Sequence, residues 1–149
     1  MSEPTEIAFA LIKFSDMEAS PTFTLLCGIT NVTVTENVET QDRRVRDCAT
    51  PNKPGTLRTK VIGDTWSISG TGLTNADQRA TIKSELKGKR IDYKVEYYRD
   101  DDTDAGELLG TDAGTAILDT STMNLDQEGE SSLEINLKGT GALTYTPAA

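Results

Sequence analysis

The sequence predicts a mainly β protein, an antiparallel β-sandwich or barrel with one flanking α-helix. Three observations carry this prediction. Only 36% of the 149 residues are hydrophobic, and 12 glycines and 5 prolines interrupt the chain at short intervals, which favours short strands and turns. Several segments alternate apolar and polar residues with the period of two that a strand requires. A single segment has the spacing of an amphipathic helix.

The first third of the chain is predicted to contain strands followed by a long loop. Residues 7–14 are apolar except for one lysine, residues 22–26 form a second apolar run, and residues 31–36 alternate β-branched and polar side chains. From about residue 37 to residue 56 the periodicity disappears among charges, prolines and a glycine. Structureless segments of this length are uncommon inside compact domains, so we predict a projecting, functional loop at about 37–56.

The middle of the chain is predicted to form a strand and then the helix. Residues 57–73 place serine and threonine side chains on one face of a strand and the tryptophan and an isoleucine on the other. The helix is predicted to begin at Thr74, which would form a capping box with Asp77, and to stop at Gly88. Its apolar face would consist of Ala76, Ala80, Ile82 and Leu86.

The last third returns to strand patterns. Residues 90–99 form the clearest strand, and residues 115–125, 131–138 and 142–146 are three more candidates. No internal repeat or linker divides the chain. We therefore expect one domain over residues 1–149, with seven or eight strands and the helix packed against them.

Charge is distributed unevenly along the chain. Residues 100–149 carry eleven acids and one base, whereas residues 1–99 carry thirteen acids and fourteen bases. Binding to a nucleic-acid backbone requires clustered Lys and Arg, so the acidic last third argues against a groove for nucleic acid. The basic cluster at Arg43, Arg44 and Arg46 allows head-to-tail contact between copies, and an acidic surface that only aids solubility remains the alternative.

The acidic segment DDDTD at residues 100–104 raises the question of a calcium loop. An EF-hand loop requires glycine at its sixth position and glutamate at its twelfth. Counted from residue 100, these positions hold Ala105 and Thr111. The segment is therefore interpreted as a solvated hairpin tip, and a weak calcium site of another type is the alternative.

Catalysis and cofactors are not expected. The chain contains no histidine, the commonest general base, and it lacks the glycine motifs that bind nucleotides. Cys27 and Cys48 lie 21 residues apart without the spacing of a zinc site, and are predicted to be partly buried thiols. With no long apolar run and no secretory signal, we expect a soluble protein without a membrane span, made in a cytoplasm.

Several segments resemble the major tail tube proteins of long-tailed bacteriophages. They are PTFTLLCGITNVTVTENVE, the charged segment ending in DCATPNKPG, TWSISGTGLTNADQRATIKSEL, and the terminal SSLEINLKGTGALTYTP. The resemblance covers nearly the whole chain, and it implies a β-sandwich or barrel with one helix. It also implies six copies in a ring, rings stacked into a hollow tube around a tape-measure protein, and DNA passing through the tube at injection.

The resemblance gives the unusual segments a role in assembly. The segment at 37–56 would be a docking arm, with Arg43, Arg44 and Arg46 as inter-subunit charges. The protein would assemble in the cytoplasm of a bacterial host and reside in the virion tail, and DNA would not be bound specifically. Two alternatives stay open: the inner tube of a contractile secretion system, and a β-sandwich adhesin or calcium-binding module.

Overall fold

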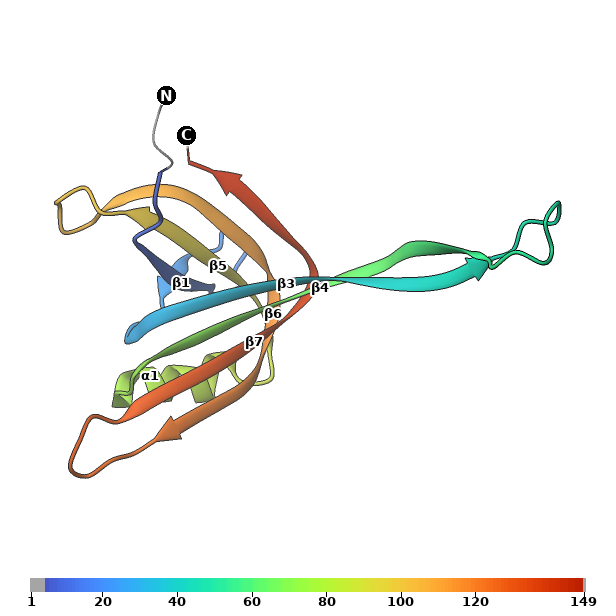
Figure 1. Ribbon diagram of the computed structural model, residues 1–149. Coiled ribbons are helices and arrows are strands. Elements are labelled where there is room, and N and C mark those ends of the chain that lie inside the picture. Colours follow the sequence, from blue (N-terminus) through green and yellow to red (C-terminus); the bar gives the residue numbers. More distant parts are fainter. Residues whose placement is uncertain (1–4, 149) are drawn as a thin grey trace. The chain divides into compact units, whose positions relative to one another are not determined.

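The computed structural model describes residues 5–148 and contains one seven-stranded antiparallel sheet (Figure 1). The strand order is β2-β1-β5-β6-β7-β4-β3. The strands are β1 (Phe9–Ser15), β2 (Phe23–Leu25), β3 (Ile29–Val45), β4 (Thr56–Leu73), β5 (Arg90–Arg99), β6 (Glu107–Asn124) and β7 (Ser132–Pro147). A short α-helix, α1 (Ala76–Thr81), continues into a π-helical turn, η1 (Ile82–Leu86). The predicted fold class, mainly β with one helix, is confirmed.

The chain forms two compact units. The first comprises Met1–Thr35 and Trp66–Ala149 and is called the sheet body. The second, Glu36–Thr65, consists of the adjoining parts of β3 and β4 and is called the hairpin. That residues 1–149 act as one domain stays a prediction.

The core of the sheet body lies on one face of its strands. On β5 the residues Ile91, Tyr93 and Val95 are buried and alternate with half-exposed neighbours, as the sequence pattern predicts. Ile82 and Leu86 of η1 belong to the same buried cluster. The helical segment therefore packs on this face. Other members of the cluster are Ile12, Phe14, Leu26, Trp66, Ile68, Ala116, Leu118, Leu133, Ile135 and Leu137.

The helix begins one residue later than the sequence predicts. Asn75, not Thr74, is the N-cap: its backbone is extended and its side chain accepts a hydrogen bond of 2.8 Å from the backbone N–H of Gln78. The predicted apolar face is correct for Ile82 and Leu86 only, because Ala76 and Ala80 are exposed while Gln78 is buried.

The helical segment stops where the sequence predicts. Gly88 follows η1 with a φ of +72°, a backbone conformation that glycine adopts without a steric penalty and that turns the chain out of the helix. The chain then enters β5 at Arg90. Neither α1 nor any other helical stretch of residues 5–148 has the length and apolar character needed to cross a bilayer.

Strands β6 and β7 are longer than predicted because glycines and irregular pairing hide their period. The candidates at 131–138 and 142–146 are one strand, β7, and β6 begins eight residues before the predicted 115. The pairing of β6 with β7 shifts register beside Gly114, and the Trp66 ring lies over this position. Its indole nitrogen donates a hydrogen bond of 3.0 Å to the carbonyl of Gly141.

The predicted loop at 37–56 is mostly wrong in its secondary structure. Strand β3 continues through Val45 and β4 begins at Thr56, so only residues 46–55 connect the two strands. Charged side chains hid the strand period because both faces of these strands are exposed.

Candidate functional site

The sheet has two open edges. Strand β2 ends the sheet on one side and strand β3 on the other, and no further strand of residues 5–148 pairs with their outer sides. The two edges differ, since β2 is only three residues long and β3 is 17 residues long. An unpaired strand edge presents backbone N–H and C=O groups that pair readily with another chain. Each copy therefore offers two different edges for association.

The predicted site residues Arg43, Arg44 and Arg46 all lie on the hairpin and are exposed. The structure does not bring the three together. Arg43 and Arg44 are neighbours on β3 and so face opposite sides, and Arg46 is the first residue after the strand. The Arg44 guanidinium donates a hydrogen bond of 3.2 Å to the carbonyl of Gly55 and thereby closes the end of the hairpin.

Arg43 shares a surface hollow with two basic residues that the sequence analysis did not single out. Arg58 and Lys60 of β4 line this hollow together with Arg43, and the remaining lining residues are Gln41, Val45 and Thr59. No carboxylate belongs to this lining. Residues 41, 43 and 45 share one face of β3, and 58 and 60 share one face of β4. If a hairpin were predicted here, the alternation of side chains along β4 would place Arg58 and Lys60 on one face and so indicate the basic cluster.

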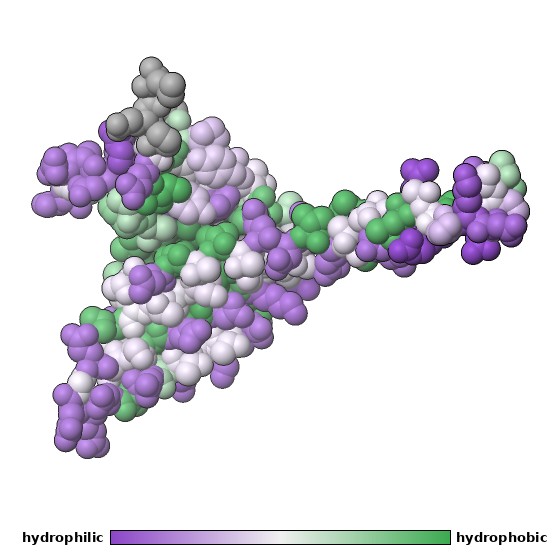
Figure 2. Space-filling view, viewed as in Figure 1, coloured by the Kyte–Doolittle hydropathy of each residue, from purple (hydrophilic) through white to green (hydrophobic). Residues whose placement is uncertain are grey.

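The hairpin has no core of its own. None of residues 36–65 is buried. Several of its apolar side chains are more than half exposed: Val38 at 62%, Leu57 at 51%, Val61 at 64% and Ile62 at 55%. Figure 2 shows apolar and hydrophilic residues interspersed along the visible surface of the hairpin. The hairpin therefore leaves apolar side chains in contact with solvent that it does not bury within itself.

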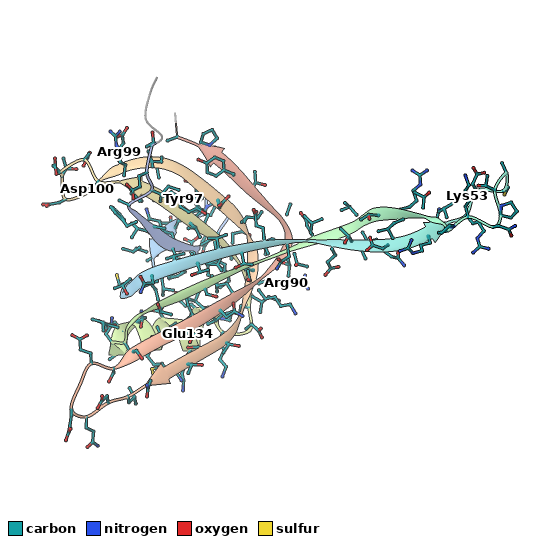
Figure 3. The ribbon with its side chains drawn as sticks, viewed as in Figure 1. Lys53, Arg90, Tyr97, Arg99, Asp100 and Glu134 are labelled. Carbon is teal, nitrogen blue, oxygen red and sulfur yellow. The ribbon has the colours of Figure 1, made fainter. Side chains whose placement is uncertain are left out.

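The acidic segment at 100–104 forms the tip between β5 and β6. All five of its residues are exposed, and Figure 3 shows Asp100 at this tip. The carboxylates of Asp100 and Asp101 accept hydrogen bonds of 3.0 Å from the backbone N–H groups two residues ahead. Hydrogen bonds from the Thr103 hydroxyl and from the Thr103 backbone N–H hold the pKa of Asp101 below its usual range. These hydrogen bonds order the turn and stabilise the ionised form of Asp101.

An ordered set of polar side chains lies on the face of the sheet body opposite the core. Lys13 of β1 forms an ion pair of 3.0 Å with Glu96 of β5, and the Tyr98 hydroxyl donates to the same carboxylate. Burial alone would raise the pKa of Glu96, but the hydrogen bonds from Tyr98 and Lys13 and the nearby lysine charges outweigh burial and lower it. Burial, with the hydrogen bond to Glu96 and its charge, raises the pKa of Tyr98 to about 12.

Neither cysteine is buried. Cys27 and Cys48 are free and exposed, so the prediction of partly buried thiols is wrong. Cys27 follows the short edge strand β2, and Cys48 lies in the connection between β3 and β4, where no core is present to cover it. Within residues 5–148, no group of three or more His, Cys, Asp or Glu side chains is placed to hold a metal ion.

Two open sheet edges and a hairpin without a core are typical of a structural subunit that is completed by other chains. The class of protein follows from a comparison of the sequence with known families. The pattern of the phage tail tube protein family matches residues 8–145, so the chain belongs to this family. No curated protein matches the sequence.

Solved structures share the fold. A protein from the tail of an empty gene transfer agent particle, refined with C6 symmetry, has a TM-score of 0.63 at 24% identity, with 91% of this chain and 94% of that chain covered. The SPP1 tail tube has a TM-score of 0.62 at 15% identity, with 97% and 80% covered.

A contractile assembly contains the same fold. A chain of the sheath-tube complex of an extracellular contractile injection system has a TM-score of 0.65 at 14% identity, with 99% of this chain and 95% of that chain covered. The fold is therefore common to tail tubes and to the assemblies of contractile injection systems, and it does not distinguish them.

Proposed function

We propose that this protein is the major tail tube subunit of a long-tailed bacteriophage. Six copies form a ring, and stacked rings form the hollow conduit through which DNA leaves the virion. Membership of the phage tail tube protein family is the observation that carries the proposal. The whole chain, residues 1–149, acts as one tail-tube-like domain, since the family match spans both the sheet body and the hairpin.

The two unlike sheet edges support ring formation. A contact between different surfaces of identical copies is heterologous, and it generates a closed ring when the rotation between neighbours closes. Pairing of the β3 edge of one copy with the β2 edge of the next has this geometry. The C6 symmetry of the related gene transfer agent tail supports a ring of six.

Arg43, Arg44 and Arg46 are proposed to act as inter-subunit charges on the hairpin. They are exposed, and the two ion pairs found among residues 5–148, Lys13–Glu96 and Arg99–Glu107, both lie in the sheet body. Because each copy has a net charge of −9, its excess carboxylates could pair with these arginines of a neighbouring copy.

The acidic balance also fits a conduit that does not retain its cargo. Carboxylates repel DNA phosphates over about 8 Å at physiological salt, so a channel of net negative charge passes DNA without specific binding. A tape-measure protein would occupy the tube before DNA does. The tube would be assembled in the bacterial cytoplasm and would form part of the virion tail.

The proposal is tested by electron microscopy of the purified, concentrated protein. We expect hollow tubes with six-fold end views, and we expect these tubes not to bind added duplex DNA stably. A protein that remains a single chain at every concentration, and is absent from tails of the particle whose genome encodes it, contradicts the proposal.

The inner tube of a contractile system is the second candidate, because the fold is equally similar to a chain of a contractile injection system. Particles carrying this protein distinguish the two, since a contractile tail has a sheath around the tube. The third candidate, a β-sandwich adhesin or calcium-binding module, predicts a single chain whose melting temperature rises with added calcium.

A further inference from the structure

Basic residues are concentrated in one part of the hairpin. Residues 43–60 contain six bases and one acid, Asp47, and so carry a net charge of +5. The other 131 residues contain nine bases and 23 acids, a net charge of −14. A lone copy therefore carries two surfaces of opposite charge that attract one another between copies. The bases are Arg43, Arg44, Arg46, Lys53, Arg58 and Lys60.

Three of these bases converge on one place. Arg43, Arg58 and Lys60 line the same hollow, and Gln41 and Thr59 add uncharged polar groups to it. Like charges gathered in one hollow repel one another, and a bound anion removes that repulsion. The hollow thus has the composition of a site for carboxylate or phosphate groups, with guanidinium groups that can bind either in a bidentate manner.

We propose that this hollow receives the acidic tip at 100–104 of a second copy of the chain. The inference rests on the proposed self-assembly, and it names the surface that the hairpin contacts. The tip presents four carboxylates in five residues, and it is held in shape by its own backbone hydrogen bonds before any partner arrives. A preordered anionic tip loses little conformational freedom on entering a basic hollow.

The molecule has a second acidic tip that can be compared with the tip at 100–104 as a possible occupant of the hollow. The connection between β6 and β7 contains Asp126, Glu128 and Glu130, three acids in five residues, and all are exposed. It lies at the opposite end of β6 from the tip at 100–104, because β6 runs from one connection to the other. The higher density of carboxylates favours the tip at 100–104 as the occupant.

A nucleic-acid phosphate, like a carboxylate, is an anion that guanidinium groups can bind. The net charge of −9 on the whole chain disfavours it, because binding to a phosphate backbone requires bases in excess of acids. Binding of duplex DNA is therefore an outcome that the test includes.

The experiment uses two single variants of the full chain and their mixture. Arg58→Glu makes the hollow repel the acidic tip, and Asp104→Lys makes the tip repel the hollow. Each variant alone should need about tenfold or more protein to form tubes, because the unfavourable contact recurs at every subunit. A 1:1 mixture should assemble at the wild-type concentration, since the carboxylate introduced at position 58 of one variant then meets the ammonium group introduced at position 104 of the other.

Controls separate a specific contact from net charge. Glu128→Lys changes the charge by the same amount as Asp104→Lys but acts on the second acidic tip. Alone it should therefore form tubes at the wild-type concentration, and in a mixture it should leave Arg58→Glu in the unassembled fraction. Circular dichroism of each variant checks that it folds. In wild-type tubes, the exposed thiol of Cys48, which lies in the 46–55 connection beside the basic strands, should react with maleimide more slowly than in the single chain.

The outcomes are distinguishable. If wild-type protein forms tubes and Arg58→Glu assembles equally well, this inference is wrong while the proposed function stands. If Glu128→Lys alone raises the protein concentration needed for tubes as much as Asp104→Lys does, or brings Arg58→Glu into tubes equally well, net charge explains the effect and the docking of the 100–104 tip is wrong. If Arg58→Glu abolishes binding of duplex DNA that wild-type protein shows, the hollow is a nucleic-acid site. If wild-type protein forms no tubes, the proposed function itself fails.

Discussion

The sheet body and the hairpin share the strands β3 and β4, yet they bury their side chains differently. The 15 hydrophobic residues that form the buried core of residues 5–148 all lie in the sheet body. In the hairpin no residue is buried, and four aliphatic side chains are more than half exposed. A two-stranded hairpin is at best marginally stable in water without packing partners. The body is therefore stabilised by its own core, whereas on the proposed function contacts with other copies would stabilise the hairpin.

The largest effect on the single chain is expected for truncation of the body core. Leu137 is fully buried, and Leu137→Ala should lower the free energy of unfolding by about 2–5 kcal/mol because it removes packing and leaves a cavity. Val61 of the hairpin is 64% exposed, and Val61→Ala should change the free energy by less than about 0.5 kcal/mol. Urea denaturation of the unassembled variants measures both. Equal losses would contradict the distinction between body and hairpin.

Substituting one glycine in the body and one in the hairpin compares the two regions again, with a smaller expected change in stability. A Cβ at Gly139 would overlap the Trp66 ring, so Gly139→Ala should destabilise the body by about 1–3 kcal/mol. At Gly63 of the hairpin the nearest atom, the Glu39 Oε2, is 3.9 Å away, and Gly63→Ala should be neutral or slightly stabilising. Thermal unfolding of the two variants gives the difference, and a loss at Gly63 that matches the loss at Gly139 would contradict it.

The smallest effect is expected from pH. Because the pKa of Glu96 is lower in the folded protein, its contribution to stability is present above its unfolded pKa and is lost as the pH falls through the folded pKa. Glu96→Gln should therefore reduce the loss of stability below about pH 4.5, by less than about 1 kcal/mol because the ion pair is partly exposed.

The matched control for this pH effect lies in the hairpin. Glu39 is exposed and belongs to neither of the two ion pairs of residues 5–148, so Glu39→Gln removes a carboxylate without removing an ion pair. Denaturation midpoints between about pH 3 and 7 for the two variants give the comparison. The role assigned to the Lys13–Glu96–Tyr98 set would be contradicted if Glu39→Gln reduced the loss of stability at low pH and Glu96→Gln did not.

Sequence reasoning predicts the body better than the hairpin, and the reason is physical. Period-two alternation arises where one strand face meets a core, so β5 can be placed at its true bounds, 90–99. In the hairpin both faces of the strands are exposed, so the residues up to Val45 show no such alternation and their pattern predicts a loop. The sequence does not single out Asn75 as the cap because two adjacent residues, threonine and asparagine, are both good N-caps.

The candidate site could be predicted only in part. The sequence identifies the basic cluster at Arg43, Arg44 and Arg46, because these residues are close in the chain. It does not identify Arg58 and Lys60 as partners of Arg43, since this requires the antiparallel return of β4 beside β3. Strand pairing decides which residues share a hollow. Because the sequence predicts a loop at 37–56, no pairing of β3 with β4 can be predicted there.

Assembly of a shortened chain tests the central claim most directly. Replacing residues 40–60 by a Gly-Ser-Gly-Ser linker removes most of the hairpin and leaves the buried core of the body untouched. In sedimentation velocity at rising concentration, the wild type should form large particles. The shortened chain should form no tubes, only single chains or closed rings, and should keep a denaturation midpoint close to that of unassembled wild type. Large particles from both proteins, or from neither, would contradict the account.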